Sequence, residues 1–93
     1  MDIFYEDETA TIYKGDMRNI LNHLEYDFII TDPPYNKNYK YPNYKDNMKE
    51  KDYIDLLGTM RGKKVIMIHY PESICNIVSQ SLGKVEKIIQ WIY

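Results

Sequence analysis

The sequence predicts an α/β fold, built on mainly parallel strands with flanking helices. Short apolar, β-branched runs alternate along the chain with segments whose apolar residues recur at helical spacing. No internal repeat and no Gly-, Pro- or Ser-rich linker interrupts residues 1–93, which fits one small domain. Such alternation favours strands that run parallel and are joined by right-handed helical crossovers.

The first third of the chain contains two predicted strands with a helix between them. Residues 9–13 form the first strand, and Asp16 can cap the helix that follows it. Apolar residues recur on one face of that helix, at Met17, Ile20, Leu21 and Leu24. Residues 27–31 contain the apolar run Phe28-Ile29-Ile30, which predicts a buried strand.

The remaining elements repeat this order. Asp52 can cap a second helix, and Gly62 suits its C-terminal end. The apolar face of that helix consists of Tyr53, Leu56, Leu57 and Met60. Residues 64–69 predict another buried strand, and Ser73 begins a third helix that Gly83 closes. Its apolar face consists of Ile74, Ile77, Val78 and Leu82. Residues 85–93 predict a last strand.

Composition narrows the functional class. The chain carries a formal net charge of −2, and its single cysteine, Cys75, has no internal disulfide partner. It shows no charged-then-apolar leader and no apolar run near the ~20 residues that span a bilayer. We therefore expect a cytoplasmic protein that acts away from membranes. His23 and His69 stand apart from other metal-ligand residues, so no metal site is expected.

The strand at residues 27–31 runs directly into Asp32-Pro33-Pro34-Tyr35. An acid at the carboxyl end of a buried strand lies where open α/β sheets bind ligands. The two prolines stiffen the loop and leave its carbonyls as acceptors, while the tyrosine offers a flat apolar face. A carboxylate, a carbonyl and an aromatic ring together suit the exocyclic amino group of a flat heterocycle.

These four residues resemble the catalytic motif of amino-methyltransferases, which move a methyl group from S-adenosylmethionine to adenine N6 or cytosine N4. Residues 12–16, residues 26–31 and Asn36 are similar to the corresponding flanks in the permuted class of DNA methyltransferases, where the catalytic motif precedes the cofactor glycines. The resemblance covers roughly residues 9–93, and is strongest over residues 12–60. It implies part of a Rossmann-like methyltransferase sheet, S-adenosylmethionine as cofactor and double-stranded DNA as partner.

The resemblance also assigns roles to single residues. The implied catalytic segment consists of Asp32, Pro33, Pro34 and Tyr35. In it, Asp32 and the carbonyl of Pro33 accept hydrogen bonds from the target amino group. Tyr35 stacks on a base that has left the duplex. Asp16 and Asp32 are expected near the cofactor. The implied substrate-binding residues are Tyr35, Asn36 and Lys37.

Each of these residues also has an ordinary structural interpretation. Asp32 can cap a turn before the prolines, and Tyr35 can be a core side chain. Asp16 can act only as a helix N-cap, or can cap and contact the cofactor together. Asn36 either pins the loop or contacts the edge of the base, and the sequence leaves both open.

The predicted loop at residues 36–50 is longer than an average connection, which favours a functional loop. Residues 1–35 carry two basic side chains against eight acids, whereas residues 36–51 carry five lysines against two acids. The tyrosines of this stretch are Tyr39, Tyr41 and Tyr44. Lysines interleaved with aromatic rings suit phosphates and unstacked bases. A merely solvated loop is the alternative.

One family feature is missing. The four glycines of the chain are scattered, and none forms the Phe-x-Gly-x-Gly turn of the cofactor site. Residues 1–93 are therefore expected to be the N-terminal part of a methyltransferase catalytic domain, as a fragment, a natural truncation or one half of a split enzyme. A complementary fragment or a second copy is the expected protein partner. The alternatives are an RNA amino-methyltransferase and a non-catalytic remnant or interaction module.

Overall fold

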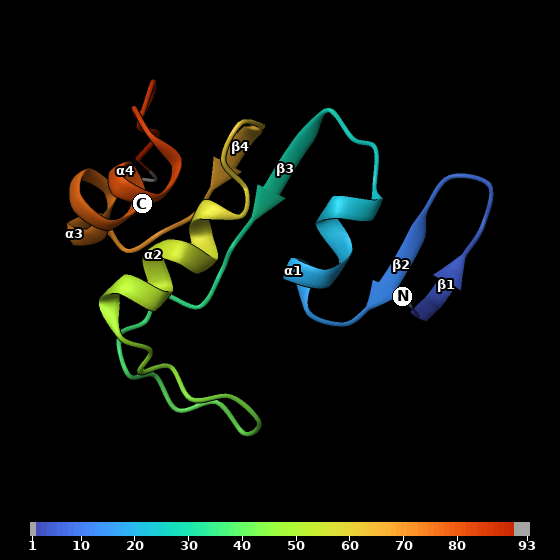
Figure 1. Ribbon diagram of the computed structural model, residues 1–93, viewed down its shortest axis with the longest axis horizontal. Helices are drawn as coiled ribbons and strands as arrows, with labels where there is room; N and C mark the ends of the chain where they lie inside the picture. The colour runs from blue at the N-terminus through green and yellow to red at the C-terminus, as the bar shows by residue number, and fades with distance from the viewer. Residues whose placement is uncertain (1, 91–93) are drawn as a thin grey trace.

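The computed structural model describes residues 2–90, which form two small, separate sheets and several short helices (Figure 1). The elements in chain order are β1 (Asp2–Glu6), β2 (Thr11–Lys14), α1 (Met17–Ile20), η1 (Leu21–His23), β3 (Phe28–Thr31), α2 (Glu50–Gly58), β4 (Lys64–Met67), α3 (Pro71–Ser73), η2 (Ile74–Val78) and α4 (Ser79–Leu82). The predicted α/β class is confirmed in this coarse sense. Parallel pairing holds in one of the two sheets, because β1 and β2 are antiparallel.

The N-terminal hairpin includes a strand that the sequence analysis does not assign, β1. Its turn is closed by Asp7, whose Oδ1 accepts the backbone N–H groups of Thr9 and Ala10, both at 2.8 Å. The Tyr5 hydroxyl donates to Oδ2 of Asp7 at 2.7 Å. These donors, with Tyr5 first, lower the pKa of Asp7 to about 2. The predicted strand at residues 9–13 thus exists as β2, paired with a partner on its N-terminal side.

The second sheet is the parallel pair of β3 and β4, in which Phe28 pairs with Lys64 and Thr31 with Met67. Beyond the last pair, the Ile68 N–H donates to the Thr31 carbonyl at 3.0 Å. Both strands were expected from their apolar runs, and both are confirmed. Since the strands run parallel, the residues that follow each of them leave the sheet at the same edge.

One face of this sheet lies against α2, where the core sits. Tyr53, Leu57 and Met60 are all but fully buried. The partly buried apolar residues around them are Met17, Leu21, Ile29, Met48, Leu56, Val65, Met67, Ile77 and Leu82. Helix α2 begins at Glu50, before the predicted cap at Asp52, and both carboxylates lie in its first turn. Acidic side chains there complement the partial positive charge of a helix N-terminus.

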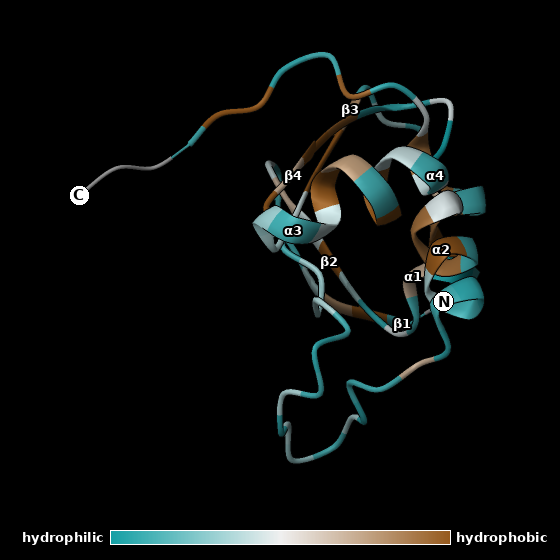
Figure 2. Ribbon diagram, turned by 90° about the vertical axis from the view of Figure 1, so that its left-hand side faces the viewer, coloured by the Kyte–Doolittle hydropathy of each residue, from teal (hydrophilic) through white to brown (hydrophobic). Residues whose placement is uncertain are grey.

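The opposite face of the β3–β4 sheet is apolar but uncovered (Figure 2). Phe28, Ile30, Ile66 and Ile68 lie on it and are between 53% and 76% exposed. Parallel sheets are usually covered on both faces, because their strands are apolar on both sides. Within residues 2–90, this face of the strand pair is therefore left without the covering layer that its sequence would suit.

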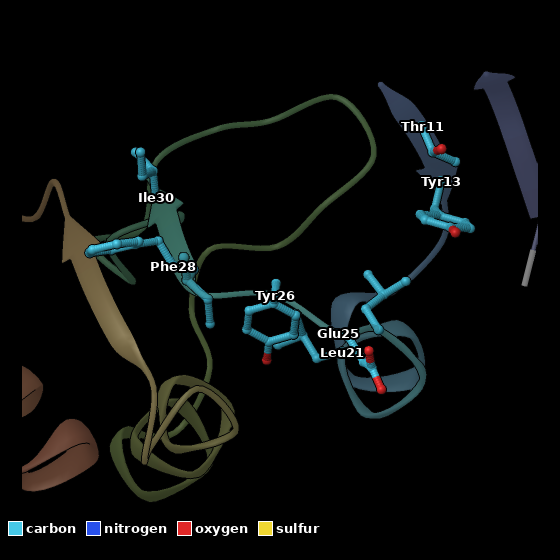
Figure 3. A pocket seen from close by; sticks show the side chains of 9 residues that line it. Thr11, Tyr13, Leu21, Glu25, Tyr26, Phe28 and Ile30 are labelled. Carbon is cyan, nitrogen blue, oxygen red and sulfur yellow. The ribbon is translucent and has the colours of Figure 1, made fainter. Parts of the chain in front are cut away.

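A hollow of about 470 Å³ separates β2 from β3 (Figure 3). Tyr13 borders it on the β2 side, and Phe28 and Ile30 border it on the β3 side. The two strands belong to different sheets and share no ladder.

The third predicted helix is present as a continuous helical segment of α3, η2 and α4, with a π-helical stretch in its middle. It begins at Pro71, a favourable first helical residue, rather than at Ser73. It ends at Gly83, whose φ of +90° suits glycine alone. Among residues 2–90, no helix has both the length and the apolar character needed to cross a membrane.

The last predicted strand is wrong over the residues that the structure describes. Residues 85–90 form no regular structure and run away from the β3–β4 pair (Figure 2). A strand is stabilised by a neighbouring ladder, and this segment pairs with neither β3 nor β4. Its apolar side chains are correspondingly open, with Ile89 90% exposed. Residues 91–93 of the prediction lie outside the described residues.

Candidate functional site

Asp32 directly follows β3, at the edge where the parallel pair ends, and is exposed. The Tyr35 hydroxyl donates a hydrogen bond to Oδ1 of Asp32 at 2.6 Å. This bond raises the pKa of Tyr35 to about 12, because the carboxylate stabilises the protonated hydroxyl. Within residues 2–90, the other carboxylate oxygen, Oδ2, has no protein donor. Asp32 is thus oriented by one neighbour and keeps one oxygen for a ligand.

The two prolines differ in what their carbonyls do. The carbonyl of Pro34 accepts a hydrogen bond from the Tyr53 hydroxyl at 2.5 Å, whereas the described residues provide no donor to the Pro33 carbonyl. Tyr53 comes from α2 and is only 2% exposed, and its burial raises the pKa of its hydroxyl. The bond therefore attaches the stiff Pro-Pro segment to the core through Pro34. Among the described residues, the Pro33 carbonyl has no donor.

His69 follows β4 and joins this site, as the parallel arrangement requires. Its ring centroid lies 5.1 Å from that of Tyr35, and its Nε2 lies 2.7 Å from the Tyr53 hydroxyl. The backbone N–H of Tyr70 donates to its Nδ1 at 2.8 Å. Burial lowers the pKa of His69 below its ordinary value of 6.5. The neutral form of the ring is therefore favoured at pH 7.

The loop after Tyr35 is organised by Asp46, which is only 2% exposed. Its carboxylate accepts the backbone N–H groups of Asn36 at 2.9 Å, Lys37 at 3.1 Å and Tyr39 at 3.0 Å. Its own carbonyl accepts the Asn38 N–H at 2.7 Å. A buried carboxylate is tolerated here because several backbone donors replace the water it has lost.

Asn36 closes the same loop from the other side. Its Nδ2 donates to the Met48 carbonyl at 2.8 Å, and its Oδ1 accepts the Met48 N–H at 2.7 Å. Its backbone has a φ of +59°, a conformation that asparagine tolerates better than most residues. Of the two roles left open by the sequence, loop pinning is the one the structure contains. Contact with a base stays a prediction.

Lys37 connects the loop to the site. Its Nζ lies 5.0 Å from the centroid of the Tyr70 ring, and that ring lies 6.4 Å from the ring of Tyr35. A cation above an aromatic face is held by the ring quadrupole. Lys37 is otherwise exposed, so its charge stands at the rim of the Asp32 site.

The outer part of the loop displays a row of tyrosine rings. Tyr39 and Tyr41 lie 4.7 Å apart, and Tyr41 and Tyr44 lie 6.0 Å apart, measured between ring centroids. A bridge between Lys40 and Lys45 brings the two arms of the loop together. All three rings are exposed. The basic, aromatic stretch predicted from the sequence is thus an ordered surface.

Asp16 is the N-cap of α1, as predicted, because its Oδ1 accepts the Arg18 N–H at 2.9 Å. The Arg18 side chain adds bonds to both carboxylate oxygens, at 2.9 Å from Nε and 2.5 Å from Nη2. The Arg18 side chain and backbone lower the pKa of Asp16 to about 2. Asp16 lies just beyond β2 and Asp32 just beyond β3, which belong to different sheets. The arrows of these two strands point the same way in Figure 1. Contact of Asp16 with a cofactor stays a prediction.

Two residues of the site were missed in the sequence. Tyr53 was assigned to an apolar helix face, yet its hydroxyl is the donor that holds Pro34. A tyrosine at a buried helix position does carry a signal, since its O–H needs a partner there. Asp46 was counted only as a charge, and no local pattern distinguishes it from the other acids of the chain.

No protein-family model matches this chain, and no curated protein or solved structure matches it. The geometry of the site and the resemblance of residues 32–35 to a methyltransferase motif are therefore the two indications of its function. That geometry consists of one exposed carboxylate, one carbonyl without a donor among the described residues, an aromatic ring and a histidine at the edge of a parallel strand pair.

Proposed function

We propose that this chain carries the amino-group-binding part of a DNA methyltransferase that uses S-adenosylmethionine and methylates adenine N6. One observation supports the proposal most: Asp32 stands exposed at the carboxyl end of a parallel strand, with Oδ1 held by Tyr35 and Oδ2 without a donor among residues 2–90. A carboxylate that only capped a turn would accept backbone N–H groups with its oxygens, as Asp46 does.

The chemistry of the target explains the need for two acceptors. The amino nitrogen of adenine shares its lone pair with the ring, so it is a poor nucleophile. Hydrogen bonds from its two N–H groups to Asp32 Oδ2 and to the Pro33 carbonyl draw the lone pair back toward nitrogen. Acceptors fixed in advance at the place where positive charge develops lower the barrier without reorganisation.

Tyr35 supplies the aromatic surface for the extruded base. Its hydroxyl is held by Asp32, and its ring contacts the ring of His69. The base therefore stacks on the face of the Tyr35 ring that points away from that histidine. Enzymes that modify a base within a duplex must first turn it out of the helix. A ring fixed beside the two acceptors would receive the base and orient its amino group together.

DNA is the proposed macromolecular partner, bound by the ordered loop. Lys37, Lys40 and Lys45 would neutralise phosphates near the base site, and each neutralised phosphate releases counterions. The three exposed tyrosine rings of the loop suit unstacked bases. Because Asp46 and Asn36 hold the loop in place, little ordering is needed when DNA binds.

The residues present fit the target amino group better than the cofactor. Both oxygens of Asp16 are engaged by Arg18, and residues 1–93 contain no glycine-rich turn. We therefore propose that a further polypeptide segment completes the S-adenosylmethionine site. Helix N-termini after glycine-rich loops are what such a segment would add.

A second candidate function, an interaction module, is favoured by the uncovered sheet face of Phe28, Ile30, Ile66 and Ile68. Apolar faces of this kind often mark contacts with another polypeptide. The two candidates are compatible if the same face receives the segment that completes the methyltransferase. They separate if the chain associates with a partner but never transfers a methyl group.

The test is transfer of a tritiated methyl group from S-adenosylmethionine to duplex DNA, with RNA as the competing substrate. The chain is assayed alone and with the glycine-rich half of a permuted methyltransferase supplied as a separate polypeptide. We expect DNA labelling in the combined sample, lost on Asp32→Ala and kept on Asp55→Ala, an exposed acid of α2. Absence of transfer in both samples, or transfer that survives Asp32→Ala, contradicts the proposal.

A further inference from the structure

A chain of three hydrogen bonds links the edge of β4 to the proline segment. The Tyr70 N–H donates to His69 Nδ1 at 2.8 Å, and His69 Nε2 lies 2.7 Å from the Tyr53 hydroxyl. That hydroxyl in turn donates to the Pro34 carbonyl at 2.5 Å. The three bonds connect segments that lie 16 and 19 residues apart in sequence.

The direction of the bonds fixes the position of the proton on the imidazole. Nδ1 lies 2.8 Å from the Tyr70 N–H and 3.5 Å from the Tyr70 carbonyl, and the shorter contact, in which Nδ1 accepts, puts the proton of the neutral ring on Nε2. Because the Tyr53 hydroxyl donates its one proton to the Pro34 carbonyl, its oxygen can accept the Nε2–H of His69. One tautomer of one protonation state therefore satisfies every donor and acceptor in the chain.

We propose that Tyr53 and His69 are positioning residues that lock the Pro34 carbonyl, and that the lock holds only while His69 is neutral and protonated on Nε2. This lock is the set of hydrogen bonds that runs from Tyr70 through His69 and Tyr53 to Pro34. Neither positioning residue is proposed to touch a substrate. They act by fixing the backbone on which Asp32 and the Pro33 carbonyl are mounted.

Protonation of His69 breaks the pattern. A second ring proton on Nδ1 would face the Tyr70 N–H, so two donors would point at each other, while the Tyr70 carbonyl lies 3.5 Å from the same nitrogen. The ring then turns toward that carbonyl, and the turn draws Nε2 away from Tyr53. The charged and titratable groups around the ring are Asp32, Tyr35, Lys37, Tyr53 and Tyr70. Burial, first, and then Lys37 favour the neutral ring, whereas the Tyr70 backbone and Asp32 favour the protonated ring.

The lock has a consequence for the site that rests on the proposed function. Two consecutive prolines have fixed φ, so a carbonyl held at Pro34 limits the orientations of Pro33 and of the strand end before it. Loss of the lock at acidic pH would let the Pro33 carbonyl and Asp32 move apart. The amino group would then lose one of its two acceptors, and turnover would fall with His69 protonation.

Nuclear magnetic resonance tests the lock without any enzymatic activity. Histidine labelled with nitrogen-15 reports the tautomer of His69, and carbonyl carbon-13 at proline reports the bond to Pro34. We expect the Nε2–H tautomer at pH 7 and a Pro34 carbonyl shift that changes with pH together with the His69 ring. A ring protonated on Nδ1, or a Pro34 carbonyl that ignores the His69 titration, would overturn the proposal.

Three variants distinguish a lock from simple packing. Tyr53→Phe keeps the ring but removes the donor, so the Pro34 carbonyl should take its unbonded shift at every pH. His69→Gln keeps an amide N–H for the Tyr53 hydroxyl but cannot titrate, so the bonded shift should persist without pH dependence. Tyr13→Phe removes a hydroxyl at the hollow between the sheets, and should change neither signal.

Circular dichroism checks that each variant is folded. If Tyr53→Phe does not fold, His69→Gln and His69→Ala make the same comparison, because only the first retains a donor. A Pro34 signal that responds to pH in His69→Gln as in the unchanged chain would overturn the lock. In the complemented methyltransferase, His69→Gln should remove the acidic limb of the pH–rate profile. A retained limb beside an intact lock contradicts only the catalytic consequence, and complete absence of transfer contradicts only the proposed function.

Discussion

Two carboxylates of neighbouring segments, Asp32 and Asp46, differ in almost every physical respect. Asp46 is buried and accepts three backbone N–H groups, so its oxygens are committed to the loop. Asp32 is exposed and accepts one tyrosine hydroxyl, and the part of the chain that the structure describes offers no donor to its other oxygen. The residue type is the same, but one carboxylate builds the loop and the other is presented by it.

The difference teaches how a binding group can be kept available. A loop that must place a free carboxylate needs its own backbone donors satisfied elsewhere, since unpaired buried N–H groups are costly. Asp46 and Asn36 do this for the loop, and Tyr53 does it for the proline segment. Asp32 can then remain exposed to solvent without a structural task beyond its bond with Tyr35.

The largest expected effect on stability comes from Asp46→Ala. It leaves three backbone N–H groups without their acceptor, and each costs about 1–3 kcal/mol, so the free energy of unfolding should fall by at least ~3 kcal/mol. Asp32→Ala, measured beside it by urea unfolding, should change the free energy by less than ~1 kcal/mol because its one bond is exposed. Equal losses of unfolding free energy in the two variants would contradict the assignment of Asp46 as the structural carboxylate and Asp32 as the presented one.

Asn36→Ala should have the next largest effect. It removes two hydrogen bonds with the Met48 backbone and keeps a φ of +59° that alanine adopts poorly, for a loss of about 2–3 kcal/mol. Asn38 has the same φ of +59° but makes no side-chain bond within the described residues, so Asn38→Ala isolates the backbone cost. If the two variants unfold at the same urea concentration, the Met48 bonds add nothing.

Replacing Lys37, Lys40 and Lys45 with Gln tests the presented side of the loop. If all three neutralise phosphates, DNA binding should weaken, and the slope of log affinity against log salt should flatten by up to about 3, since each phosphate contributes ~0.9. Fluorescence anisotropy of a labelled duplex over a salt series measures both. The matched control is Lys84→Gln, which lies outside the loop. An unchanged salt slope would mean that these lysines do not contact phosphates and that the loop is only a solvated surface.

The smallest expected effect is the pH dependence of stability. Below pH 6.5 the unfolded chain protonates His69 before the folded chain does, so the free energy of unfolding falls as pH decreases toward the lowered pKa. Asp16 acts in a separate window. Its stabilisation is complete above pH 3.8 and is lost as pH falls toward about 2, and exposure keeps it small. His69→Gln should flatten only the upper window in urea titrations, and an unaltered upper slope would contradict this assignment.

The fold was predictable where local patterns decide it. The apolar runs of β3 and β4 and the helical spacing of α2 each predict the element that the structure contains. Strand β1 and the segment at residues 85–90 were not predictable in this way. Whether a β-prone run becomes a strand depends on a partner edge, which β2 offers to β1 and which residues 85–90 do not find.

The candidate site was predictable in its centre and not in its support. Asp32 and Tyr35 were identified from one short motif, and the parallel strands predict that His69 lies at the same edge. The tasks of Asp46 and the Tyr53 hydroxyl arise from contacts seven to 19 residues away in sequence. Such contacts depend on the path of the loop, which composition does not encode.

The most direct test of the central claim asks whether Asp32 receives an amino group. Deoxyadenosine and N6,N6-dimethyldeoxyadenosine have the same ring, but only the first has N–H donors on the exocyclic nitrogen. In titrations followed by nuclear magnetic resonance, we expect deoxyadenosine to shift the Asp32 carboxyl and Tyr35 ring signals, and the dimethyl compound to shift them far less. Asp32→Ala should remove this preference, while Asp55→Ala should retain it. Equal shifts from both nucleosides, or a preference that survives Asp32→Ala, would contradict the assignment of Asp32 as the amino-group acceptor.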